Sequence, residues 1–237
     1  ELRWLLKACG ATDTDTTRTG VGALVHDLAE QAARNDWSEA RLVEEFERRW
    51  PGLGLGQGWV GRREHDRVRP MVQRLGQWLA DNPRTVVAVE APFDVAIGRA
   101  RLVGRVDRLE RDEHGRLLVV DLKTGRSSVK DDDLAVHPQL AAYQLAVEHG
   151  AFDELAAERR SGGASLVQLG AVKGEAREQV QPPLAEFDDP GWPEALLART
   201  ADGMAGAVFR AERTTWCGFC PARPSCPAHP EGGQVTP

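Results

Sequence analysis

The segment Val119-Val-Asp-Leu-Lys-Thr-Gly125 constrains the fold more than any other stretch of the sequence. Its apolar run predicts a buried strand over about 117–122. Because side chains alternate along a strand, Asp121 and Lys123 are expected on one face and Leu122 on the other. A carboxylate beside an ammonium suits phosphodiester hydrolysis, since the first holds a divalent cation and the second orients water or stabilises developing charge. Taken alone, an Asp-x-Lys pair is more often a surface ion pair.

The elements predicted around this strand indicate an α/β layered core, because a helix precedes several strands and a crossover helix follows them. Residues 111–116 read as a hairpin loop, residues 173–190 are polar and Pro-rich, and the run Asp131–Asp133 reads as a solvated loop. The expected helices cover about 21–50 (broken near Asn35, with a cap at Ser38), 59–80, 138–148 and 193–210, and the strands cover 85–97, 100–109, 117–122 and 165–172.

A second carboxylate is expected near Asp121. Gly104-Arg-Val-Asp107-Arg lies on the preceding hairpin strand, so Asp107 approaches Asp121 if both face the same side of the sheet. Two adjacent carboxylates repel, and a divalent cation is the simplest compensation. The alternative is a surface ladder in which Asp107 pairs with Arg105 or Arg108.

Two helical segments supply further polar candidates. Gln139-Leu-Ala-Ala-Tyr143 places Gln139 and Tyr143 one turn apart on one helical face, and Gly22-Ala-Leu-Val-His26 places a histidine on a largely apolar helix. Each also has an ordinary structural explanation, an amphipathic helix in the first case and a hydrogen-bonded core histidine in the second.

Taken in order along the chain, these residues resemble the nuclease motifs of the RecB-like branch of the PD-(D/E)XK superfamily. This branch includes RecB, the AddA and AddB nuclease domains, AdnA and AdnB, and a CRISPR-associated exonuclease group. The resemblance covers roughly residues 20–150, and Glu90-Ala-Pro-Phe looks like the family's first core strand. It implies a restriction-endonuclease-like core, a mixed sheet flanked by helices, with a cysteine metal-site tail at the C-terminal end.

The resemblance also implies which residues hold a catalytic metal. Asp107 and Asp121 would be the acidic ligands, helped by His26 and the main-chain carbonyl of Leu122. Magnesium suits carboxylate, carbonyl and water ligands, and manganese is expected to substitute for it.

The remaining motif residues would act beside the metal. Lys123 corresponds to the catalytic lysine, and Gln139 and Tyr143 would support Lys123 or the DNA strand. Glu90 stays open between a structural role and a role in the site.

A cysteine cluster, Cys217-x2-Cys220-x5-Cys226, follows near the C-terminal end, and its spacing predicts a metal site. With His229 the three cysteines would make a Cys3His zinc site. Alternatively, an upstream cysteine completes a [4Fe–4S] cluster, as the resemblance to AddB-like members implies. The fourth ligand would then be Cys9, which falls one to two turns later than the family's usual position, or a cysteine preceding this fragment of a longer chain.

The net charge of −6 says little about nucleic-acid binding, because local patches decide it. Two arginine clusters are open between DNA contact and a solvated face: Arg62, Arg63, Arg67 and Arg69, and Arg99, Arg101, Arg105 and Arg108. No apolar run is long enough to span a bilayer and no signal peptide is visible, so we expect a cytoplasmic protein without a membrane partner.

Three segments are expected: residues 1–58 carrying the His motif, a nuclease core over 59–175, and a C-terminal helix and cysteine cluster over 176–237 that pack back on the N-terminus. The resemblance implies a Mg²⁺-dependent nuclease acting on single-stranded DNA within a bacterial helicase–nuclease for double-strand break repair. No phosphate-binding P-loop is present, so the helicase partner would be another domain or subunit. The alternatives are a freestanding CRISPR-associated exonuclease, an inactive DNA-binding domain, and a metal-stapled protein-interaction module.

Overall fold

The structure, a computed structural model, describes residues 16–156, 159–170 and 173–230. The chain divides into two compact units. Thr17–Glu194 forms the unit that contains the sheet and the helices covering it, and the described residues from Ala195 onward belong to the other.

A five-stranded mixed sheet lies at the centre of the first unit, with strand order β1-β2-β3-β4-β5. Strands β3 and β4 are parallel, and the other neighbouring pairs are antiparallel. Strand β3 is buried over nearly its whole length because helices cover both faces of the sheet, which explains its continuous apolar run. The strands are β1 (Thr85–Ile97), β2 (Ala100–Arg111), β3 (Leu117–Lys123), β4 (Ser161–Gln168) and β5 (Arg177–Gln181).

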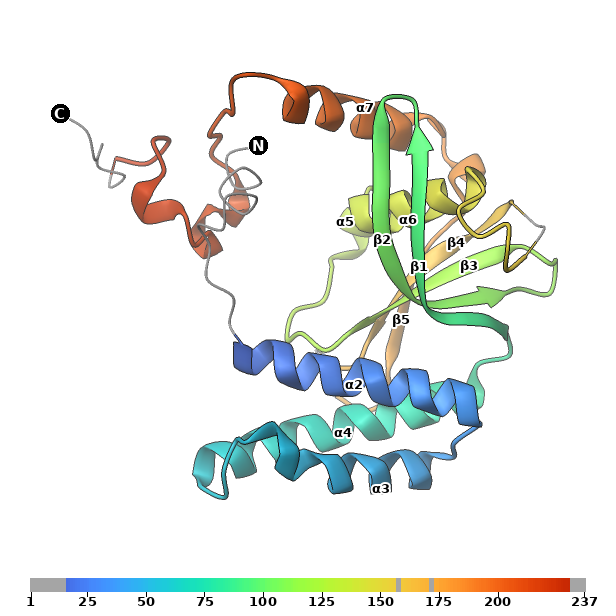
Figure 1. The fold of residues 1–237 in the computed structure, drawn as a ribbon, viewed down its shortest axis with the longest axis vertical. Helices are drawn as coiled ribbons and strands as arrows, with labels where there is room; N and C mark the ends of the chain where they lie inside the picture. Colours follow the sequence, from blue (N-terminus) through green and yellow to red (C-terminus); the bar gives the residue numbers. More distant parts are fainter. Residues whose placement is uncertain (1–15, 157–158, 171–172, 231–237) are drawn as a thin grey trace. The chain divides into compact units, whose positions relative to one another are not determined.

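Three helices cover one face of the sheet (Figure 1): α2 (Thr16–Asn35), α3 (Glu39–Arg49) and α4 (Trp59–Asp81). Their apolar sides form one core with the even-numbered residues of β3, including Leu122. The Ser38 side chain accepts the Arg41 N–H at 3.3 Å, which confirms the predicted cap of α3. A short 3₁₀ helix, η1 (Trp50–Leu53), follows α3.

The opposite face is covered by α6 (Pro138–Glu148), which with the short α5 (Asp131–Leu134) makes the crossover from β3 to β4. Helix α6 is buried on most sides, and its apolar residues pack with Val119 and Leu166 in a second core. Because α6 packs over the odd-numbered residues of β3, its polar side chains can reach the end of that strand.

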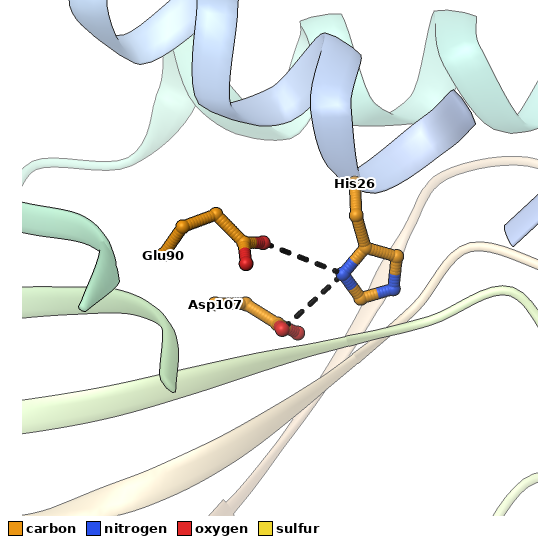
Figure 2. Close-up of side chains that lie close together, drawn as sticks. All are labelled: His26, Glu90 and Asp107. Atoms are coloured by element: carbon orange, nitrogen blue, oxygen red, sulfur yellow. Dashed lines mark ion pairs between the residues drawn. The ribbon is translucent and has the colours of Figure 1, made fainter. Parts of the chain in front are cut away.

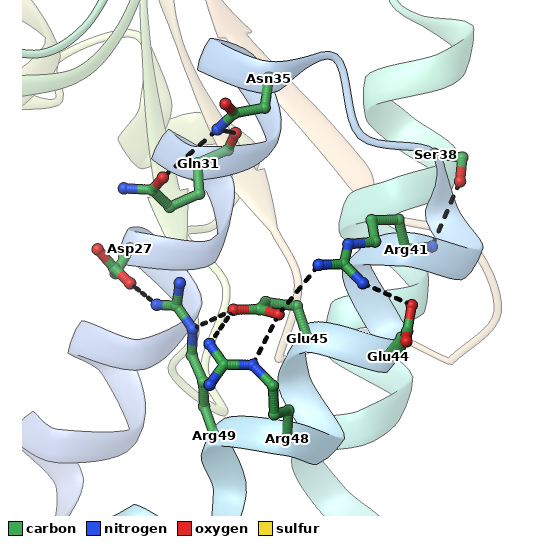
Figure 3. Close-up of polar contacts among 9 residues, drawn as sticks. All are labelled: Asp27, Gln31, Asn35, Ser38, Arg41, Glu44, Glu45, Arg48 and Arg49. Carbon is green, nitrogen blue, oxygen red and sulfur yellow. Dashed lines mark hydrogen bonds and ion pairs between the residues drawn. The ribbon is translucent and has the colours of Figure 1, made fainter.

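An ion-pair cluster joins α2 to α3 (Figure 3). The Glu45 carboxylate, whose side chain is 5% exposed, accepts hydrogen bonds from Arg48 and Arg49, and Arg49 also reaches Asp27 on α2. These bonds, led by that from Arg48, lower the pKa of Glu45 to about 2. The cluster therefore ties α3 to α2 at Asp27, the residue that follows His26.

The α/β class and the mixed sheet flanked by helices are confirmed, and several details differ. Strand β4 begins at Ser161, four positions before the expected start, and Asp131–Asp133 begin α5 where a loop was predicted. Helix α7 (Trp192–Ala205) ends before the expected 210. The polar stretch 173–190 contains β5 and η2 (Leu184–Glu186), because the glutamines of β5 are buried through hydrogen bonds.

Candidate active site

Asp107 lies where β2 separates from β3. The pairing of these strands ends at Arg108 opposite Val120, while β2 continues with β1 as a hairpin that projects from the sheet (Figure 1). The Asp107 Oδ2 atom accepts the Leu122 N–H at 2.7 Å. The carboxylate thereby accepts an N–H of β3 that a backbone carbonyl of a paired strand would otherwise accept.

The second oxygen of Asp107 faces His26 of α2 and Glu90 of β1 (Figure 2). The His26 Nδ1 atom lies 3.2 Å from Asp107 Oδ1 and 3.9 Å from Glu90 Oε1. One ligand atom from each of the three residues lies within 4.8 Å of the other two, close enough to share a metal ion. All three side chains are half-buried.

Glu90 has an unusual backbone. Its φ of +48° lies in the left-handed region, which a residue with a side chain rarely adopts. Val89 pairs with Arg108 and Ala91 with Val106, so Glu90 lies opposite Asp107 at the bend of the hairpin. Strained backbone at a bend that brings two carboxylates together is typical of a functional site.

Asp121 and Lys123 lie on the face that α6 covers. The Lys123 Nζ atom lies 2.7 Å from Asp121 Oδ2 and donates to Gln139 Oε1 at 3.0 Å. The Asp121 Oδ1 atom accepts from Gln139 Nε2 at 2.7 Å and from the Tyr143 hydroxyl at 3.2 Å. Gln139 therefore bridges Asp121, Lys123 and Tyr143, to which it also donates at 2.8 Å.

Burial and neighbouring carboxylates shift the pKa values of the candidate residues. Burial raises the pKa of Asp121, with the charge of Asp107 adding to it and Lys123 opposing it. Burial and Asp107 likewise raise the pKa of Glu90. Burial alone would lower the pKa of His26, but the Asp107 hydrogen bond and the surrounding carboxylates outweigh it and raise that pKa.

The family model of the PD-(D/E)XK nuclease superfamily matches residues 1–227 of the chain. The chain belongs to this nuclease superfamily. Comparison with curated proteins gives no match. Among solved structures, the one described as "Crystal structure of SSO0001" is similar, with 17% sequence identity, coverage of 86% of this chain and 85% of that chain, and a TM-score of 0.34. That TM-score is too low to add to the assignment.

The nuclease chain offers a donor set that fits a hard divalent cation. Carboxylate oxygens with one imidazole nitrogen suit Mg²⁺ or Mn²⁺. Asp121 Oδ2 is buried and, apart from its ion pair with Lys123, accepts no hydrogen bond from the residues that the structure describes. Lys123 therefore partners this oxygen, which still has a lone pair that a bound cation could occupy.

The predicted motif residues of this nuclease come from four elements and form two groups, which the hydrogen bond from the Leu122 N–H to Asp107 links. His26 comes from α2, Asp107 from β2, Asp121 and Lys123 from β3, and Gln139 with Tyr143 from α6. The arginine ladder on Asp107 is wrong: Arg108 is 7% exposed and pairs with Glu110, and Arg105 approaches Glu90 at 3.6 Å. The Leu122 carbonyl stays a predicted ligand.

His137 is a neighbour of the site that sequence reasoning missed. His137 is the N-cap of α6, where its Nδ1 atom accepts the Leu140 N–H at 3.5 Å. Burial, with a smaller contribution from Lys123, lowers the pKa of its imidazole. The signal was the proline that follows it, because proline favours the first turn of a helix.

The cysteine segment of the nuclease belongs to the other unit. Cys217 lies in η3 (Thr215–Phe219), Cys226 follows η4 (Arg223–Ser225), and the three cysteines are free thiols. Backbone hydrogen bonds link successive turns from Cys217 to His229. The Thr214 N–H donates to the Cys217 Sγ atom, and this bond lowers the pKa of the Cys217 thiol. No three metal-ligating groups of this segment come within 4.8 Å of one another in its described part. Cys9 lies outside the described residues, so the cysteine metal site stays a prediction.

No helix in the described parts of the chain is long and apolar enough to cross a membrane.

Proposed function

We propose that this chain is a Mg²⁺-dependent deoxyribonuclease of the RecB-like branch, acting on single strands as the nuclease domain of a bacterial helicase–nuclease in double-strand break repair. One observation carries the proposal. The Asp107 carboxylate contacts His26 and the Leu122 N–H, and on the same strand β3 Asp121 and Lys123 form an ion pair held by Gln139. Convergence of these groups from separate elements has no simpler structural explanation than a cation-dependent hydrolytic site.

Each residue has a defined part in this proposal. Asp107, Asp121 and His26 would hold the cation with the Leu122 carbonyl, and Glu90 lies close enough to His26 and Asp107 to join them. A cation held by these residues would supply Lewis-acid chemistry, polarising the phosphate and lowering the pKa of a bound water.

The neighbouring side chains would position the reacting groups. Lys123 orients the attacking water or stabilises charge on the phosphate, because its Nζ atom is held by Asp121 and Gln139. The Tyr143 hydroxyl donates to Asp121, and burial together with Asp121 raises the pKa of Tyr143, so it stays protonated as a donor.

An inactive DNA-binding domain is the second candidate. It needs neither the acidic pair nor the lysine, whereas this chain keeps both in contact with ordered partners. A freestanding CRISPR-associated exonuclease would use the same site, and the presence of helicase motifs elsewhere in the full gene distinguishes the two.

The test is cleavage of labelled single-stranded DNA by the wild type and by Asp121→Ala, with Mg²⁺ and with EDTA. We expect the wild type to cut only with Mg²⁺ and the variant to lose cleavage while keeping its fold. Asp94→Asn is the matched control, because Asp94 is an exposed carboxylate of β1 that pairs with Arg101. Full activity of Asp121→Ala would refute the assignment.

For the cysteine segment we propose a [4Fe–4S] cluster held by Cys217, Cys220, Cys226 and a fourth cysteine, with Cys9 as the one upstream cysteine of this chain. Its function would be structural, linking the two ends of the domain. Broad absorbance near about 400 nm in anaerobically purified protein supports the cluster. The zinc alternative draws on His229, whose Nε2 atom is buried without a partner among the described residues, and it predicts a colourless protein that contains zinc.

A further inference from the structure

A strip of aromatic and basic side chains, exposed at Trp59 and Arg63 and half-buried at Arg67, runs along the first turns of α4. Trp59, Arg63 and Arg67 are spaced by four residues, so they follow one another on the same side of the helix. Trp59 is 68% exposed. Its indole is open to solvent beside the arginines and is therefore available for a base to stack on it.

The strip adjoins the end of the strand that carries Asp121 and Lys123. Arg126 lies three residues after Lys123, within about 10 Å along an extended chain. Its guanidinium lies 3.7 Å from Glu64 of α4, and Arg67 donates to Glu64 at 2.8 Å. Figure 1 shows the beginning of α4 and the end of β3 on the same side of the sheet-and-helix unit. Positive side chains therefore continue from the candidate active site onto α4.

Charge favours a polyanion over an apolar partner here. Arg63 is exposed and has no ion-pair partner among the residues that the structure describes, and the Arg126 side chain is 61% exposed. In the described part of the chain, Glu64 is the one carboxylate that pairs with these side chains, and it is shared between Arg67 and Arg126. The strip therefore keeps a net positive charge. A basic track with an aromatic side chain is how proteins bind single strands, since phosphates follow the charges and bases stack on the ring.

We infer that the strip formed by Trp59, Arg63, Arg67 and Arg126 binds single-stranded DNA beyond the scissile phosphate, with a base stacked on Trp59. This rests on the proposed function, because it takes the strand at Lys123 as its starting point. Duplex DNA fits the strip less well, since its bases are stacked inside and are not available to the indole.

The test measures binding of a labelled oligothymidylate of about 16 nucleotides, the upper end of usual site sizes, with Ca²⁺ in place of Mg²⁺ and intact DNA checked on a gel. We expect Trp59→Ala to weaken binding between about 5-fold and about 150-fold and Trp59→Phe to retain most of it. Arg63→Ala should lower the slope of log K against log salt by about 0.7.

Two controls separate this from a general loss of charge or fold. Arg69→Ala removes a positive charge of α4 that pairs with Glu47, on another side of the helix, and should bind as the wild type does. A blunt duplex should bind Trp59→Ala and wild type equally. Unfolding temperatures should be unchanged, because Trp59 is exposed.

Equal binding of the oligothymidylate by wild type, Trp59→Ala and Arg63→Ala, or no binding by any of them, would overturn the inference. Failure of the proposed function gives a different result. If the wild type never cuts with Mg²⁺ but Trp59→Ala binds the oligothymidylate more weakly than the wild type, the strip remains a DNA-binding surface and the proposed nuclease activity is refuted.

Discussion

The imidazole of His26 lies 3.2 Å from the carboxylate of Asp107, although His26 belongs to the helical layer and Asp107 to the sheet. This contact joins helix α2 to strand β2 at the candidate site. Glu90 lies on the same side at 3.9 Å from His26, while Asp121 and Lys123 lie toward α6. The site is therefore assembled between the two layers, and its residues can be altered separately.

Lys123→Ala should lower kcat for DNA cleavage by about 100-fold to about 1,000-fold, the range for removing a group that stabilises charge in a transition state. Divalent cation affinity should persist, because the carboxylates and His26 remain. Steady-state kinetics and Mn²⁺ titration check the two parts. Lys130→Ala, an exposed lysine before α5, should behave as the wild type, and equal losses in both variants would contradict a specific role for Lys123.

Gln139→Ala should lower kcat by about 10-fold to about 100-fold with little change in KM, because Lys123 and Asp121 lose the amide that holds them both. The measurement is the split between kcat and KM, with the unfolding temperature taken in parallel. A variant that unfolds more easily but cuts at the wild-type rate would limit Gln139 to a structural role.

Glu90→Gly and Glu90→Ala should differ from each other in stability but should lose metal affinity to the same extent. At φ of +48° alanine keeps the backbone strain and glycine relieves it. The Glu90→Gly variant should therefore be more stable than Glu90→Ala by about 1 kcal/mol. Both lose the carboxylate and should bind Mn²⁺ more weakly than the wild type. Denaturant unfolding and Mn²⁺ titration check this pair. Unchanged Mn²⁺ affinity in both would remove Glu90 from the metal site.

Glu45→Gln should destabilise the protein at neutral pH and lose that effect in acid. The folded-state pKa of Glu45 is lowered to about 2 from its ordinary 4.5, so its ion pairs contribute stability above pH 4.5 that is lost as pH falls toward 2. The difference in unfolding free energy between variant and wild type should therefore shrink across that window. A difference that stays constant between pH 7 and pH 3 would contradict the assignment.

The parts of the fold that could be predicted from the sequence are those whose burial follows apolar periodicity. Strand β3 reads as a strand because Leu117–Val120 and Leu122 are apolar, and its alternation places Asp121 and Lys123 together. Helix α6 is delimited by Pro138 at its first turn.

Strand β5 could not be predicted, because its burial depends on partners from distant segments. Gln179 donates to the Val129 carbonyl, and Gln181 donates to the Leu134 carbonyl. Gln144, fully buried in α6, donates to Gln181 and Pro182. A sequence of arginine, glutamate and glutamines is polar by composition, and only tertiary hydrogen bonds make its burial favourable.

The sequence named the candidate residues, which stay predictions as site residues, but it did not give their geometry. Motif order pointed to His26, Asp107 and Asp121, whereas the position of Glu90 depends on a left-handed backbone at a bend that no periodicity reports. The pairing of Arg108 with buried Glu110 was equally hidden, because both residues look like a solvated face in the sequence.

The most direct measurement is an anomalous difference map from crystals of the wild-type protein grown with Mn²⁺. We expect a peak bounded by His26, Asp107 and Asp121, which would be lost in Asp121→Ala crystals together with Mn²⁺-dependent cleavage. An ordered protein with these carboxylates in place, no peak between them, and cleavage that persists would contradict a metal-dependent nuclease centre at this position.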